Sequence, residues 1–155
     1  MVLGRRALLG SAVLSLPVLA RQAGAQGSPV LTLGVMTDLS GPYSETGGQS
    51  SVVCCQQAAA EAMAAMPGLR VEVVAGDHQN KPDVAAGMAR QWFDQDGVDA
   101  VLDMPNSSIG LAVAQVAAEK DKACLISGAG TADLTGSRCA PTNIHWTFDT
   151  WMLAR

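Results

Sequence analysis

Charged and aromatic residues are scarce in this sequence. Charged residues make up 15% of the 155 positions and aromatic residues 4%, and only two histidines are present. Two isolated histidines do not make a zinc site, and no glycine loop followed by Lys-Ser or Lys-Thr is present to bind phosphate. The sequence therefore gives no indication of a zinc enzyme or a P-loop enzyme, and we expect no cofactor.

Basic residues are the scarcer of the two charged classes. The chain has ten Lys and Arg against fourteen Asp and Glu, and three of the arginines fall within the first 25 residues. If those residues are removed, the formal net charge of the remainder is −7. An acidic protein without a Lys/Arg cluster is a poor partner for nucleic acid or for an anionic membrane, so we expect a small-molecule partner instead.

The first 25 residues have the features of an export signal. Arg5-Arg6 precedes fourteen uncharged, mostly apolar residues, 7–20, and Ala23-Gly24-Ala25 fits a small-x-small cleavage site. The apolar run is shorter than the roughly 18 residues of a membrane span, which favours a signal peptide over an anchor. The arginine pair is similar to a twin-arginine signal, with an ordinary secretory signal as the alternative. Both alternatives predict a periplasmic protein.

Strand-like and helix-like segments alternate through the rest of the chain. Strands are predicted over 30–36, 69–75, 98–102, 122–127 and 143–147, and helices over 48–66, 82–94 and 107–120, with 128–141 mostly loop and a further helix begun at the end of the chain. This alternation predicts an α/β fold, with an open parallel sheet and helices on both faces. The abrupt end within a predicted helix suggests a fragment.

A polar loop follows each predicted strand. These loops are 38–44, 77–80, 105–108, 127–131 and 146–150, and they are rich in hydroxyls, amides, small residues and aromatics. Because the carboxyl ends of parallel strands share one edge of the sheet, the loops should gather there. Their few charges suit a small polar ligand held by neutral hydrogen bonds.

Each candidate residue in these loops also has a purely structural explanation. Ser107 and Asn106 are placed to cap the third helix, although two such residues after a proline favour a ligand site. Tyr43 and Trp146 are two of only six aromatic residues, which favours walls around a ligand over core positions. Asp149 would either hold an ammonium group or cap the last helix, and capping is the better prediction.

Signals for catalysis are weak. Ser127 lacks the glycine that precedes the serine in a nucleophile elbow. His78 beside Asp77 is more typical of a hydrogen-bonded loop pair than of a catalytic dyad, and His145 lies within a predicted strand. Asp38 and Asp103 would converge as the acidic residues of a phospho-acceptor domain do, with Ser127 nearby, but the fifth strand carries no lysine. We therefore expect no enzyme.

The four cysteines leave two alternatives open. None has metal-ligand spacing, and a disulfide between Cys124 and Cys139 would join a strand to the loop before the next strand. Buried free thiols are the other interpretation, and neither alternative indicates a function.

Five stretches in the same order are similar to one known family: 33–43, 77–82, 105–108, 125–135 and 145–151. They resemble the substrate-binding proteins of ABC importers, in the branched-chain amino acid and amide group with the type I periplasmic fold. The resemblance implies the flavodoxin-like strand order and a bilobed protein that closes on its ligand and delivers it to a membrane permease. Residues 26–155 would be a truncated N-terminal lobe, with the second lobe absent.

The resemblance also implies roles for individual residues. Ser107 and Thr131 would bind the polar head of the ligand with their hydroxyls, and Ala129 and Gly130 would add hydrogen bonds from the loop backbone. The carboxylate of Asp149 would meet an amine of the ligand. The aromatic rings of Tyr43 and Trp146 would form apolar walls. The main hypothesis is thus a solute-binding lobe. The ectodomain lobe of a sensor is a second, and a secreted α/β hydrolase using Ser127 or His78 a third.

Overall fold

The computed structural model describes residues 29–155, so the predicted signal peptide over 1–25 lies outside the described residues. The strands are β1 Val30–Thr37, β2 Arg70–Asp77, β3 Ala100–Asp103, β4 Ala123–Ile126 and β5 Asn143–His145. The helices are α1 Gly48–Ala65, α2 Pro82–Asp94, α3 Ser107–Glu119, the 3-10 turn η1 Ala132–Leu134 and α4 Thr150–Leu153. Strand and helix alternate as predicted, and η1 is a short element within the predicted 128–141 loop.

The five strands form one parallel sheet in the order β2-β1-β3-β4-β5. This is the flavodoxin-like order, so the prediction of fold class is confirmed. The predicted third strand begins two residues too early. Val98 is fully buried and its N–H donates to the carbonyl of Trp92, which ties it to the end of α2 rather than to the sheet.

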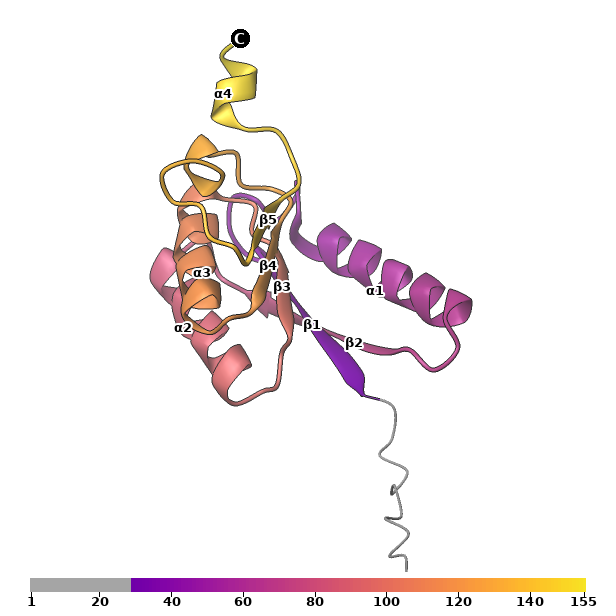
Figure 1. Ribbon diagram of the computed structural model, residues 1–155. Helices are drawn as coiled ribbons and strands as arrows, with labels where there is room; N and C mark the ends of the chain where they lie inside the picture. Colours follow the sequence, from indigo (N-terminus) through magenta and orange to yellow (C-terminus); the bar gives the residue numbers. More distant parts are fainter. Residues whose placement is uncertain (1–28) are drawn as a thin grey trace, which may run out of the picture.

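Helices cover both faces of the sheet, but unequally. Figure 1 shows α2 and α3 side by side on one face and α1 alone on the other. The main apolar core lies under α2 and α3, where Met36, Val101 and Ile126 from three neighbouring strands pack with Trp92 and Val113. Trp92 and Val113 belong to the apolar faces of α2 and α3, which fixes both helices on the sheet.

The opposite face of the sheet is left open beyond α1. One row of side chains in register crosses it, from Val35 in β1 through Leu102 and Leu125 to Ile144 in β5. Val35 is buried, whereas Ile144 is 47% exposed, so exposure rises with distance from α1. The described residues therefore leave part of this apolar face uncovered. Among residues 29–155, no helix combines the length and apolar character needed to span a bilayer.

Candidate functional site

Four of the five polar loops meet at the carboxyl edge of the sheet, as predicted. They enclose a cavity of about 480 Å³. The lining residues come from the ends of β1, β3, β4 and β5 and from the start of α1: Tyr43, Thr46, Gly47, Ser51, Asp103, Pro105, Ser127, Gly128 and Phe148. Because strand ends position each of these loops, the site is built on the rigid part of the fold.

The loop after β1 is held in shape by two carboxylates. Asp38 is fully buried, and its two oxygens accept the N–H groups of Gly41 at 2.8 Å and Tyr43 at 2.9 Å. Asp77, at the end of β2, accepts the N–H of Leu39 at 3.0 Å and the hydroxyl of Ser40 at 2.6 Å. The remaining predicted loop, 77–80, therefore supports the loop that carries Tyr43 and does not line the cavity.

Hydrogen bonding also decides the ionisation of Asp77. Partial burial would raise the pKa of its carboxyl group, but the hydrogen bonds from Ser40, Gln79 and Leu39 outweigh that effect and lower the pKa. The carboxylate is therefore the stable form at neutral pH, as its role of holding two loops together requires.

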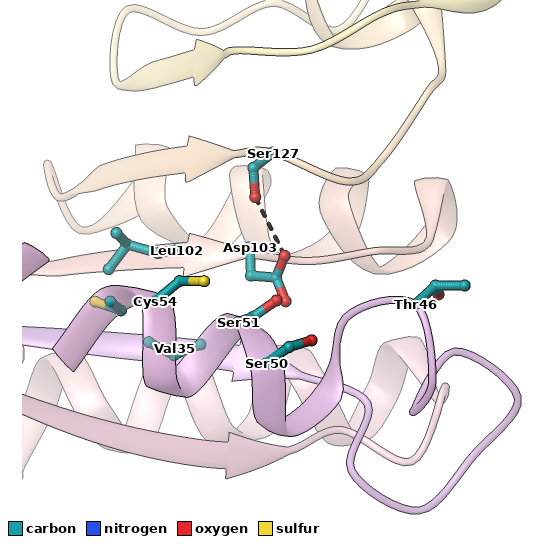
Figure 2. A pocket seen from close by; sticks show the side chains of 9 residues that line it. Val35, Thr46, Ser50, Ser51, Cys54, Leu102, Asp103 and Ser127 are labelled. Carbon is teal, nitrogen blue, oxygen red and sulfur yellow. Dashed lines mark hydrogen bonds between the residues drawn. The ribbon is translucent and has the colours of Figure 1, made fainter. Parts of the chain in front are cut away.

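Asp103 and Ser127 lie together at the centre of the site. The hydroxyl of Ser127 donates to Asp103 Oδ1 at 3.1 Å, and Figure 2 shows the carboxylate between Ser127 and Ser51. Asp103 and Met104 both have positive φ, 85° and 53°, a conformation that costs energy for residues with a Cβ. Hydrogen bonds from Met104 N to β1 and from Ser127 N to Asp103 O hold this bend.

Of the two predicted capping residues of α3, one takes that role. Asn106 is the capping residue, since its Oδ1 accepts the N–H of Ser108 at 2.8 Å and the Ser108 hydroxyl at 2.7 Å. Ser107 is the first residue of the helix, one position later. The asparagine side chain accepts the N–H two residues further along the chain, which is the usual geometry of a helix cap. Ser107 is therefore not the capping residue.

The other predicted loop residues make hydrogen bonds within the loops. Ala129 O contacts His145 Nε2, and Gly130 O accepts the N–H of Thr150 at 2.7 Å. Thr131 Oγ1 accepts the N–H of Asp133 at 3.3 Å and caps η1. Asp149 caps α4 by accepting the N–H of Met152 at 2.7 Å, which is the alternative the sequence favoured. None of these four predicted residues lines the cavity.

The aromatic residues of the predicted loops lie on two different surfaces. Tyr43 lines the cavity, together with Phe148, which the sequence had not singled out although it lies in one of the five similar stretches. Trp146 is 83% exposed and borders an adjoining hollow of about 340 Å³ with Leu102, Leu125 and Ile144. Trp146 thus lies at the border of the open apolar face.

Thr46 and Ser51 were also missed by sequence reasoning. Thr46 lies between the predicted loop and the first helix, and Ser51 lies in the first turn of that helix. The signal that would have found them is the concentration of hydroxyl residues over 44–51, directly after the loop.

The free-thiol alternative holds for all four cysteines, although only Cys124 is buried, and both histidines are engaged within the protein. All four cysteines are free, so the Cys124–Cys139 disulfide is not formed; Cys124 is buried in β4, whereas Cys139 is exposed. Burial raises the pKa of Cys124 to about 12. His78 is fully buried, and its Nδ1 accepts the N–H of Asn80 at 3.0 Å, so it is a loop residue and is not exposed to a substrate. Among residues 29–155, no cluster of His, Cys, Asp or Glu could hold a metal ion.

Comparison with solved structures shows strong similarity over most of the chain. A periplasmic binding protein from Burkholderia mallei is 40% identical, with a TM-score of 0.77, and covers 81% of this chain and 33% of its own. A periplasmic ligand-binding protein of a branched-chain amino acid ABC transporter from Burkholderia xenovorans LB400 is 37% identical, with a TM-score of 0.73 and coverages of 77% and 32%.

A more distant structure has the same fold. The substrate-binding protein LivJ of a branched-chain amino acid transporter from Streptococcus pneumoniae, in complex with isoleucine, is 23% identical, with a TM-score of 0.67 and coverages of 78% and 34%. The chain therefore spans about a third of the length of these proteins.

Comparison with curated protein sequences finds no match. The family model described as periplasmic binding protein matches residues 30–155, which is nearly the whole described part of the chain. The strand order, the converging loops and this match agree. The chain belongs to the periplasmic binding protein family.

Proposed function

We propose that residues 26–155 form the N-terminal ligand-binding lobe of a solute-binding protein that serves an ABC importer. Its ligand would be an amino acid of the branched-chain type or a related amide. The observation that carries the proposal is the cavity at the carboxyl edge, where hydroxyls, backbone groups and two aromatic rings from four loops face one space. Such a lining suits a small polar ligand with an apolar side chain.

The relatives support this ligand class and the importer. The Burkholderia xenovorans protein, 37% identical, is named as part of a branched-chain amino acid ABC transporter, and the more distant Streptococcus pneumoniae protein is described with isoleucine. Membership of the family supports a periplasmic location, and the arginine pair at the start of the chain supports the twin-arginine route of export.

The predicted binding residues keep distinct parts in this proposal. Ser107 and Thr131 would bind the polar head of the ligand, and the N-terminus of α3 would favour a carboxylate there. The carbonyls of Ala129 and Gly130 are engaged with His145 and Thr150, so their N–H groups would be the ones to meet the ligand.

The hydrolase hypothesis receives no support from the contacts of Ser127. Its hydroxyl donates to Asp103, and among residues 29–155 neither histidine is hydrogen-bonded to it. A serine nucleophile needs a base within hydrogen-bond reach, so binding is the better reading of this serine.

Ligand-dependent melting of the full-length protein tests the proposal. We expect the Tm to rise with the concentration of leucine, isoleucine, valine or a short aliphatic amide, because ligand binds only the folded state. Ser107→Ala and Thr131→Ala should each weaken this rise, whereas Ser137→Ala, an exposed serine in the loop after η1 whose hydroxyl donates to Asp133, should not. Flat melting curves across the amino acids and amides would overturn the proposal.

A further inference from the structure

Three adjoining hollows share Asp103 and Ser127. Besides the cavity of about 480 Å³ and the hollow beside Trp146, a third, of about 360 Å³, lies between α1 and the sheet. Among the described residues that line these hollows, Asp103 is the single charged side chain, and no lysine or arginine faces it. The electrostatic character of the site is therefore set by one carboxylate.

One oxygen of that carboxylate lacks a partner. Asp103 is 9% exposed; its Oδ1 accepts from Ser127, but Oδ2 has no hydrogen-bond donor within residues 29–155. A carboxylate oxygen left unsatisfied in a buried position is costly, and native proteins rarely leave one without a partner or a functional reason. Asp38, in contrast, has no unpartnered carboxylate oxygen, since both of its oxygens accept backbone N–H groups.

The surroundings of Oδ2 form a small oxygen-rich recess. Thr37 Oγ1, Asp103 Oδ2 and Ser51 Oγ lie 3.3, 3.4 and 3.5 Å from the point where a Cβ on Gly47 would stand. Because residue 47 is glycine, no side chain from that position fills this recess, which lies beside the cavity that Gly47 and Ser51 line. Thr37 Oγ1 already accepts the N–H of Gly48 at 3.0 Å, so Asp103 Oδ2 and Ser51 Oγ are the oxygens left for a group that donates hydrogen bonds and carries positive charge.

We propose that Asp103 binds a protonated nitrogen of the ligand and makes the site select amines or amidines over acids of the same shape that lack the nitrogen. The inference rests on the proposed solute-binding function and assigns the specificity-determining residue within it. Asp149, which the resemblance offered for an amine, is engaged in capping α4, so Asp103 is the better partner.

Calorimetric titration of the full-length protein with matched probes tests this inference. The probes are L-isoleucine against 2-hydroxy-3-methylpentanoate, and benzamidine against benzoate. We expect the nitrogen-bearing member of a pair to bind about 10- to 100-fold more tightly, as a hydrogen bond to a charged group implies. Asp103→Asn should remove at least about tenfold of that preference, because it keeps the shape and the acceptor for Ser127 but not the charge.

Asp121→Asn is the matched control. Asp121 also has positive φ, 53°, but is exposed in the turn before β4 and does not line the hollows, so its variant should keep the full preference. Ser127→Ala, which removes the donor to Oδ1 but not the charge, should still favour the amine. Melting curves show whether each variant is folded.

The outcomes separate the two proposals. If no probe binds and the amino acid and amide panel is also flat, the solute-binding function itself fails. If probes bind but both members of each pair bind equally, or if Asp103→Asn keeps the preference, the function stands and the assignment of Asp103 is overturned.

Discussion

The indole ring of Trp92 in α2 lies directly against the Cα of Gly34 in β1. A Cβ on Gly34 would stand 2.5 Å from Cζ3 and 2.6 Å from Cε3 of the ring, far inside van der Waals contact. Since Trp92 is buried in the main core, it has little room to move. We expect Gly34→Ala to lower the free energy of unfolding by about 1 to 3 kcal/mol, as overpacking does, measured by denaturant unfolding.

Gly87 provides the control for this prediction. It lies on the exposed side of α2, and a Cβ there would meet nothing within 4 Å. Gly87→Ala should therefore leave stability unchanged or raise it by up to about 1 kcal/mol through helix propensity. Equal losses of stability in the two variants would show that α2 does not pack on β1 through Trp92.

Periodicity predicted the fold because each strand and helix has its own local signal. The alternation of Leu31, Leu33 and Val35 indicated β1, and Pro67-Gly68 ended α1 close to the predicted residue. The start of β3 was missed because Val98 is as apolar as a strand residue. Its N–H, however, is bound to the end of α2, and that tertiary contact is invisible in the sequence.

The site was predictable in its loops but not in its centre. Composition located the Tyr43 and Asn106 loops, yet it could not tell which of Asn106 and Ser107 would cap α3, because both are good capping residues. The importance of Asp103 depends on an oxygen left without a donor, and that requires knowing where Ser127 and Gly47 lie in space.

Asp38 should be the main determinant of the Tyr43 loop. Its buried carboxylate accepts two backbone N–H groups, and Asp38→Ala would leave both without partners. We expect a loss of about 1 to 3 kcal/mol in denaturant unfolding. Ser40→Ala, which removes one exposed hydrogen bond to Asp77 in the same region, should cost less than about 1 kcal/mol. If Asp38→Ala were as mild as Ser40→Ala, the loop would be held by other contacts.

His78 should make stability depend on pH. Burial lowers the pKa of its imidazole, and the nearby carboxylates Asp38, Asp77 and Asp103 offset this only in part. Below about pH 6.5 the unfolded chain therefore binds a proton that the folded chain does not. The contribution of His78 to the free energy of unfolding should be constant above that pH. It should fall as the pH drops from about 6.5 toward the lower pKa of His78 in the folded state.

Melting curves between pH 8 and pH 5 measure this effect. His78→Gln should flatten the pH dependence in the window just below about pH 6.5, whatever its effect on stability at pH 8. NMR titration of the His78 ring gives the direct check, and a midpoint above about 6.5 would contradict the prediction.

The thiols should differ sharply in reactivity. Cys124 is buried in β4 with its pKa raised to about 12, whereas Cys54 and Cys139 are exposed. Because the thiolate is the reactive form, iodoacetamide should label Cys54 and Cys139 in the native protein and spare Cys124 until it unfolds. Mass spectrometry of the peptides reports this. A disulfide would instead protect Cys139 as well and lower the unreduced mass by two hydrogens.

Ile126 and Ile144 should have very different weights in stability, although they lie on neighbouring strands. Ile126 faces α2 and α3 and is fully buried, whereas Ile144 is 47% exposed on the open face. Ile126→Ala should cost about 2 to 5 kcal/mol because it leaves a cavity, and Ile144→Ala less than about 1 kcal/mol. Denaturant midpoints of the 155-residue chain measure both. Equal losses of stability in the two variants would mean that the open face is covered in solution. If a second copy of the chain covers it, the stability lost in Ile144→Ala should become smaller on dilution.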